Sequence, residues 1–208
     1  MGGEPQVRER IEAVSSASAQ LLLFQELLPA NLEDWLADVL TRPDEQEAAA
    51  ACALVADELR ASAGFMAANG FVHFDAHFRN LLTDGRRLFF ADLGLAASTD
   101  FVLDDDERAF VVAHATYDGA NVLALLVYSV VAALTDAADW QERFALVKRW
   151  ADGHVPAGVS AAVADVVGRY VPIAVVMNDF ATRLMAGGTV TEYPAAAVGR
   201  AYAAATLP

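Results

Sequence analysis

The stretch VHFDAHFRNLLTDGRRLFFADLGLA, Val72 to Ala96, decides the fold of this 208-residue chain. It contains two short apolar runs, Leu81-Leu82-Thr83 and Leu88-Phe89-Phe90-Ala91, separated by a turn sequence that begins with Asp84-Gly85. An Asp-Gly pair between apolar runs predicts a β-hairpin, because glycine tolerates the positive φ of a tight turn. The two ends of such an antiparallel ribbon lie side by side, so the residues that flank the hairpin become neighbours.

Three polar side chains flank this predicted hairpin. Asn80 enters the hairpin, Asp92 leaves it, and Asp75 lies on the loop that leads to the same end. An amide oxygen and a carboxylate suit Mg²⁺, which binds through few protein groups together with substrate phosphates. A further carboxylate can accept a proton from an attacking hydroxyl. The spacing therefore predicts a magnesium site, Asn80 and Asp92, beside a candidate general base, Asp75.

The order of these residues resembles the catalytic loop and metal-binding motif of the protein-kinase-like superfamily. The family pattern H-x-D-x-x-x-x-N followed by D-x-G is matched, with its spacing intact, by residues 73–80 and 92–94. The resemblance implies that Asp75 is the catalytic base and that Asn80 and Asp92 hold Mg²⁺ on bound ATP. It also implies that His73 braces the loop.

Details of the motif bring it nearest to one branch of that superfamily. His77 resembles the aminoglycoside phosphotransferase and choline kinase branch, where His is usual at this position, and it either orients Asp75 or contacts a phosphate. Phe74, Phe78 and Leu93 depart from the pattern. Phe74 replaces the Arg that reads activation-loop phosphorylation in many protein kinases, so this form of regulation is not expected.

Residues 21–36 resemble the hinge between the two lobes of a kinase: a strand, a short polar crossing and a helix capped by Asn31. Backbone groups of the family's hinge bind adenine, which implies an ATP contact at Glu26, Leu27 and Leu28. An ordinary strand-to-helix loop is the alternative interpretation.

The resemblance and the apolar patterns together predict an α+β, mainly helical protein. Residues 1–28 are expected to form a residual small-lobe hairpin and hinge strand, with a helix over Val7 to Val14 as the alternative for its first part. Residues 29–208 are expected to form the C-terminal lobe of a kinase-like fold, including a long helix over 45–68 and three further helices after residue 118.

The phosphate-gripping part of a kinase is missing from the pattern. No Gly-rich phosphate loop precedes the hinge-like segment, and Lys148, far downstream, is the single lysine of the sequence. Two interpretations follow: a kinase lobe separated from its small lobe, or a one-lobe module that binds Mg²⁺-nucleotide or a partner without transferring phosphate. A third is a hydrolase in which His73, Asp75 and His77 bind a transition metal such as Zn²⁺, but it leaves the Asn80-hairpin-Asp92 arrangement unexplained.

The composition limits the classes of partner that this chain is expected to bind. A formal net charge of −14 argues against nucleic acid, whose binding depends on Lys and Arg. The acidity favours a cationic substrate, although an acidic solubility bias explains it equally well. The uncharged run Gly119 to Leu134 is shorter than a membrane-spanning helix and is expected to be a buried helix. Cys52 is the single cysteine, and no signal peptide is recognisable, so a cytoplasmic location is expected.

The expected function is an ATP- and Mg²⁺-dependent phosphotransferase that acts on a hydroxyl of a small molecule or a protein. A catalytically inactive binding module is the alternative. The hinge strand expected over Leu21 to Leu28 has no small lobe to pair with, so it is expected to bind a separate small lobe or to associate with a second copy of the chain.

Overall fold

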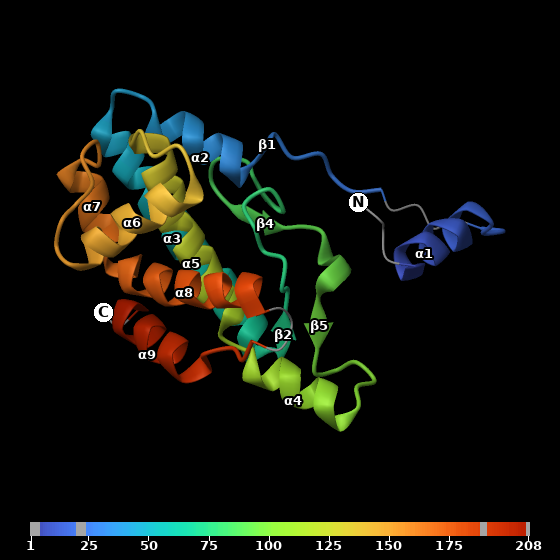
Figure 1. Cartoon of the computed structure of the whole chain (residues 1–208). Coiled ribbons are helices and arrows are strands. Elements are labelled where there is room, and N and C mark those ends of the chain that lie inside the picture. The colour runs from blue at the N-terminus through green and yellow to red at the C-terminus, as the bar shows by residue number, and fades with distance from the viewer. Residues whose placement is uncertain (1–4, 20–23, 188–190, 207–208) are drawn as a thin grey trace.

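The computed structural model describes residues 5–19, 24–187 and 191–206, and this part is α+β and mainly helical, as predicted (Figure 1). Its helices are α1 Pro5–Ser15, α2 Leu32–Leu40, α3 Glu45–Ala68, α4 Asp105–Ala113, α5 Tyr117–Leu134, α6 Trp140–Ala151, α7 Ala161–Val167, α8 Val171–Gly187 and α9 Ala195–Thr206. Its strands are β1 Ala30–Asn31, β2 Phe71–Val72, β3 Leu81–Thr83, β4 Leu88–Phe90 and β5 Ala97–Ser98, and short 3-10 helices cover Leu93–Leu95 and Gly168–Tyr170.

The predicted hairpin is confirmed. β3 pairs antiparallel with β4, with Leu81 opposite Phe90 and Thr83 opposite Leu88, and β1 extends the sheet on the other side of β3. In the turn, the Asp84 carboxylate accepts hydrogen bonds from two following backbone N–H groups at 2.8 and 2.9 Å. Gly85 has a φ of +82°, the left-handed conformation that the Asp-Gly pair predicts.

Helix α5 lies at the centre of the helical body. It packs against α2, α3, α6, α8 and α9, and most of its side chains are buried, as expected for the uncharged run Gly119 to Leu134. By length and composition alone, two described helical stretches, Asp105–Leu134 and Ala161–Gly187, are apolar enough to cross a membrane. Their apolar windows are 61% and 44% buried inside the fold, and a core helix gives the same signal. Cys52 is also buried in this core, as expected.

The N-terminal hairpin prediction is wrong for the residues that the structure describes. Pro5–Ser15 is a helix, α1, which was the alternative interpretation, and Figure 1 shows it apart from the helical body. The segment begins with proline and is rich in Glu, Arg, Gln and Ala, which favour a helix more strongly than its weak alternation favours a strand.

The hinge strand expected over Leu21 to Leu28 is not observed where the structure describes it. Residues 24–28 have no regular secondary structure, and residues 20–23 lie outside the described part. The strand at this crossing is the two-residue β1, which pairs with β3. The predicted helix cap is confirmed, because the Asn31 side chain accepts a hydrogen bond from the backbone N–H of Asp34 at 2.9 Å.

Candidate functional site

The loop between β2 and β3 is fixed to the hairpin by His73. Its ring is fully buried, Nε2 lies 3.0 Å from the backbone oxygen of Ala91, and Nδ1 accepts from the N–H of Asp75 at 3.3 Å. A carbonyl oxygen can only accept, so Nε2 carries the hydrogen in this arrangement. His73 thus joins the loop to the end of β4, the bracing position that the resemblance implied.

Asp75 and Asn80 face each other across the loop. The Asn80 side-chain nitrogen donates to the Asp75 carboxylate and to its backbone oxygen, both at 3.0 Å. With that nitrogen used as a donor, the amide oxygen of Asn80 is the atom available to a cation. The backbone oxygen of Asn80 also accepts from Ala91 N–H at 2.8 Å, which closes the open end of the hairpin.

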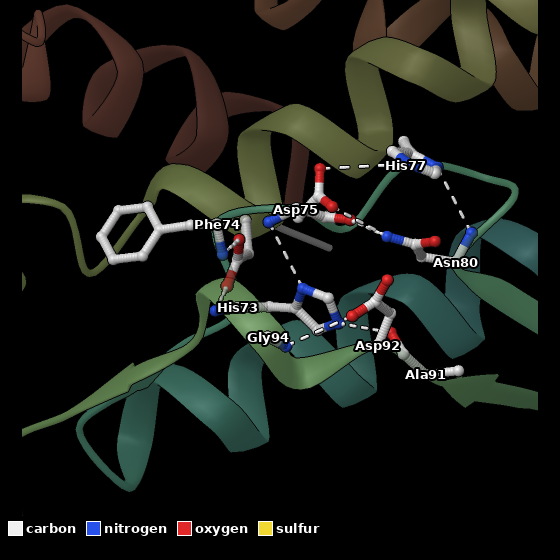
Figure 2. Close-up of polar contacts among 9 residues, drawn as sticks. His73, Phe74, Asp75, His77, Asn80, Ala91, Asp92 and Gly94 are labelled. Atoms are coloured by element: carbon white, nitrogen blue, oxygen red, sulfur yellow. Dashed lines mark hydrogen bonds and ion pairs between the residues drawn. The ribbon is translucent and has the colours of Figure 1, made fainter. Parts of the chain in front are cut away.

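Asp92 follows Ala91 directly and therefore lies at the same end of the hairpin as Asn80, as the sequence predicted. Its backbone is left-handed, with φ 57° and ψ 70°, a conformation that Asp tolerates better than most residues. Its carboxylate accepts weakly from Gly94 N–H at 3.3 Å and is otherwise exposed. Figure 2 shows the side chains of Asp75, Asn80 and Asp92 gathered around one region beside the hairpin.

His77 lies on the outer side of Asp75. Its Nε2 is 3.9 Å from a carboxylate oxygen of Asp75, and its Nδ1 accepts from the N–H of Asn80 at 3.3 Å. His77 therefore lies beside the Asp75 carboxylate without a hydrogen bond to it, and both expected roles stay predictions (Figure 2).

Asp118 is a site residue that the sequence reading missed. Its carboxylate is 4% exposed and accepts from the backbone N–H of His73 at 2.5 Å and of Phe74 at 3.0 Å. Burial raises the pKa of Asp118, and the two backbone donors act in the opposite direction. The sequence signal was a lone carboxylate at the edge of the apolar run 119–134, and only the fold brings it to the loop.

Phe74 explains why the loop needs this support. It has a φ of +63°, which is strained for an aromatic residue, and both of its flanking amides are held by the Asp118 carboxylate or the His73 ring. Its ring packs against Phe110, His114 and Tyr117, with ring centroids 5.5 to 5.9 Å apart. The Phe74 side chain therefore packs onto α4 and α5.

The expected adenine contacts are not brought into this cluster. Glu26, Leu27 and Leu28 lie on the irregular segment that runs from β1 toward α1, and the structure gives them no hydrogen bond to the loop among the described residues (Figure 1). Glu26 and Leu27 are exposed. The adenine contact remains a prediction from the resemblance.

The transition-metal interpretation finds no support in the geometry. Among the residues that the structure describes, no group of three or more His, Cys, Asp or Glu side chains could hold a metal ion. Both ring nitrogens of His73 are already in hydrogen bonds. The oxygen pair of Asn80 and Asp92 instead suits a hard cation that completes its coordination with phosphate oxygens.

No protein-family model matches this chain, and a search of curated proteins finds no match.

Proposed function

We propose that this chain is the C-terminal lobe of an ATP- and Mg²⁺-dependent phosphotransferase of the protein-kinase-like type. The observation that carries the proposal is the gathering of Asp75, Asn80 and Asp92 at the open end of the β3–β4 hairpin. The loop that carries Asp75 is held in place by the hydrogen bonds of the His73 ring and by the Asp118 carboxylate, which accepts from its backbone. Phosphoryl transfer depends mainly on positioning and charge stabilisation, so a rigid group of oxygen ligands beside a carboxylate base suits that chemistry.

Each residue of the group has a distinct proposed role. Asp75 accepts the proton of the acceptor hydroxyl while that oxygen bonds to the γ-phosphorus, and the bond from the γ-phosphorus to the bridging oxygen of ADP breaks. Asn80 holds the Asp75 carboxylate in place through the 3.0 Å hydrogen bond. Asn80 and Asp92 are the proposed ligands of Mg²⁺, which when bound neutralises charge on the β- and γ-phosphates.

The sequence also supports a second candidate, nucleotide binding without transfer. Lys148, the single lysine, lies on α6 and is 3.9 Å from Asp179 on α8, so it belongs to the helical body rather than to the loop. A phosphate-gripping lysine must therefore come from a separate small lobe if transfer is to be efficient. A module that binds Mg²⁺-ATP alone needs only the oxygen cluster.

Calorimetric titration of the purified chain with ATP, with and without Mg²⁺, tests the metal assignment. We expect Mg²⁺-dependent binding that Asp92→Ala weakens by at least about tenfold, because the variant loses a charged ligand. Asp165→Ala, which removes an exposed carboxylate on α7, is the matched control and should bind as the wild type does. Equal affinity of the wild type and Asp92→Ala contradicts the proposed metal site.

The two candidate functions are separated by Asp75→Asn. The variant keeps a side chain of similar shape but cannot take up the hydroxyl proton, so Mg²⁺-ATP binding should persist while ADP release in the presence of an acceptor stops. A wild-type chain that binds Mg²⁺-ATP but releases no ADP, even with a small lobe of a related enzyme added in trans, indicates the binding module.

A further inference from the structure

A groove of about 390 Å³ lies beside the loop, between α2, α5 and the start of α6. His77 and Phe78 of the loop form part of its wall. Since Nε2 of His77 is 3.9 Å from the Asp75 carboxylate, this groove reaches the neighbourhood of the proposed base. Its size is that of a small-molecule site rather than of a protein-docking surface.

The groove is mainly apolar and has one flat aromatic wall. Trp140, at the start of α6, stacks on Tyr128 of α5 with ring centroids 4.5 Å apart and an interplanar angle of 29°. Tyr128 is buried, whereas Trp140 remains 41% exposed. The indole therefore offers a face on which a planar apolar group of a ligand can stack.

Glu33 and Arg143, two side chains of opposite charge, line the groove and differ in whether a neighbouring residue neutralises them. The Glu33 carboxylate is compensated, because Arg79 donates two hydrogen bonds to it at 3.1 and 2.9 Å. Arg143 donates through Nε to a backbone oxygen at 3.2 Å and forms no ion pair with any residue in the described part of the chain. Its terminal nitrogens suit a carboxylate, which guanidinium groups bind through paired hydrogen bonds.

Tyr128 contributes its ring, not its hydroxyl, to the groove. The Tyr128 hydroxyl is buried without a hydrogen-bond partner among the residues that the structure describes, and Tyr128 lines the groove. The hydroxyl is closed off from solvent, and the Asp179 carboxylate on α8 acts on it electrostatically. The ring of Tyr128, stacked on Trp140, is therefore its contribution to the groove wall.

We propose that this groove binds the acceptor, and that the acceptor is a small hydroxylated molecule with a planar apolar ring and a carboxylate. The ring stacks on Trp140, the carboxylate binds Arg143, and the hydroxyl lies at the His77 end, toward Asp75. The acceptor role rests on the proposed function, whereas binding in the groove requires neither nucleotide nor Mg²⁺.

Two probes that share a hydroxymethylphenyl ring and carry opposite charges test this inference: 4-(hydroxymethyl)benzoate and 4-(hydroxymethyl)benzylamine, titrated into the full chain by ligand-observed NMR. We expect the carboxylate probe to bind at least about tenfold more tightly than the amine. Arg143→Gln should remove that preference. Arg149→Gln, on the same helix but outside the groove, should keep it.

Equal affinity for the two probes, or a preference that survives Arg143→Gln, overturns the inference. Titration of the same samples with Mg²⁺-ATP reports on the proposed function separately. Nucleotide binding that depends on Asp92, without binding of either probe, refutes the groove and leaves the proposed function standing. Probe binding that depends on Arg143, without nucleotide binding, supports the ligand class and contradicts the proposed nucleotide site of this chain.

Discussion

Replacing Asp118 by asparagine should loosen the whole 72–80 loop. The carboxylate accepts two backbone hydrogen bonds in a site that is 4% exposed, and asparagine can accept only one of them while its NH₂ group faces the other donor. Losing a charge-assisted bond and leaving one N–H unsatisfied costs about 3 kcal/mol. Relief of the buried charge offsets part of this cost, so we expect a net loss of about 2 kcal/mol, or roughly 4 to 8 °C in Tm.

The effect of Asp118→Asn should also depend on pH in a defined direction. Burial raises the pKa of Asp118 in the folded state above its value in the unfolded chain. The carboxyl therefore contributes stability that is fully present below the unfolded pKa and is lost as the pH rises through the folded pKa. Asparagine does not titrate. The difference in the free energy of unfolding between the wild type and the variant should therefore grow as the pH is lowered from 7 toward 4.

Urea denaturation followed by far-UV circular dichroism measures both effects. Asp165→Asn, an exposed carboxylate on α7, provides the matched control and should lie within about 0.5 kcal/mol of the wild type. If Asp118→Asn is as stable as this control at pH 7, or if its deficit shrinks on acidification, the assigned role of Asp118 is refuted.

Three further changes test other parts of the fold. Gly85→Ala should cost about 1 kcal/mol in thermal or urea unfolding, because the turn holds φ at +82° while the added methyl meets only Trp35 at 3.6 Å; no loss would contradict the turn geometry. Asp104→Ala removes the capping box of α4 and should cost about 1 kcal/mol, seen as faster hydrogen exchange confined to that helix. Phe24 and Leu27 are each 94% exposed, so sedimentation over a concentration series should show self-association that Phe24→Ser with Leu27→Ser reduces; a monomer at all concentrations contradicts it.

Local signals were sufficient for the parts of the fold that depend on a few neighbouring residues. The Asp84-Gly85 turn and the Asn31 cap are determined by hydrogen bonds within three residues, and both predictions are confirmed. The prediction of an N-terminal hairpin is wrong because it depended on pairing between segments that are not close neighbours in the sequence. A hairpin there needed a partner strand at Leu21 to Leu28, and weak alternation over residues 8–14 could not outweigh their helix propensity.

The candidate site was predictable only in part. The proximity of Asn80 and Asp92 follows from hairpin geometry, because the two residues flank the same pair of strands. The contact of Asp118 with His73 spans 45 residues and depends on how α5 docks, which no local pattern encodes. The groove is similarly invisible in sequence, since Trp140 and Tyr128 become neighbours only when α6 folds back onto α5.

The contact between Asp118 and His73 also determines the order in which parts of the site form during synthesis. The loop that carries Asp75 leaves the ribosome before Asp118 does, because His73 on this loop precedes Asp118 by 45 residues. Until α5 has formed and docked, the Asp118 carboxylate does not hold the backbone of Phe74 at its positive φ, and the Phe74 ring lacks its contact with Tyr117. A nascent chain that already contains Asp75, Asn80 and Asp92 therefore lacks the support that α5 gives to their arrangement. The group reaches its final geometry only after α5 has docked.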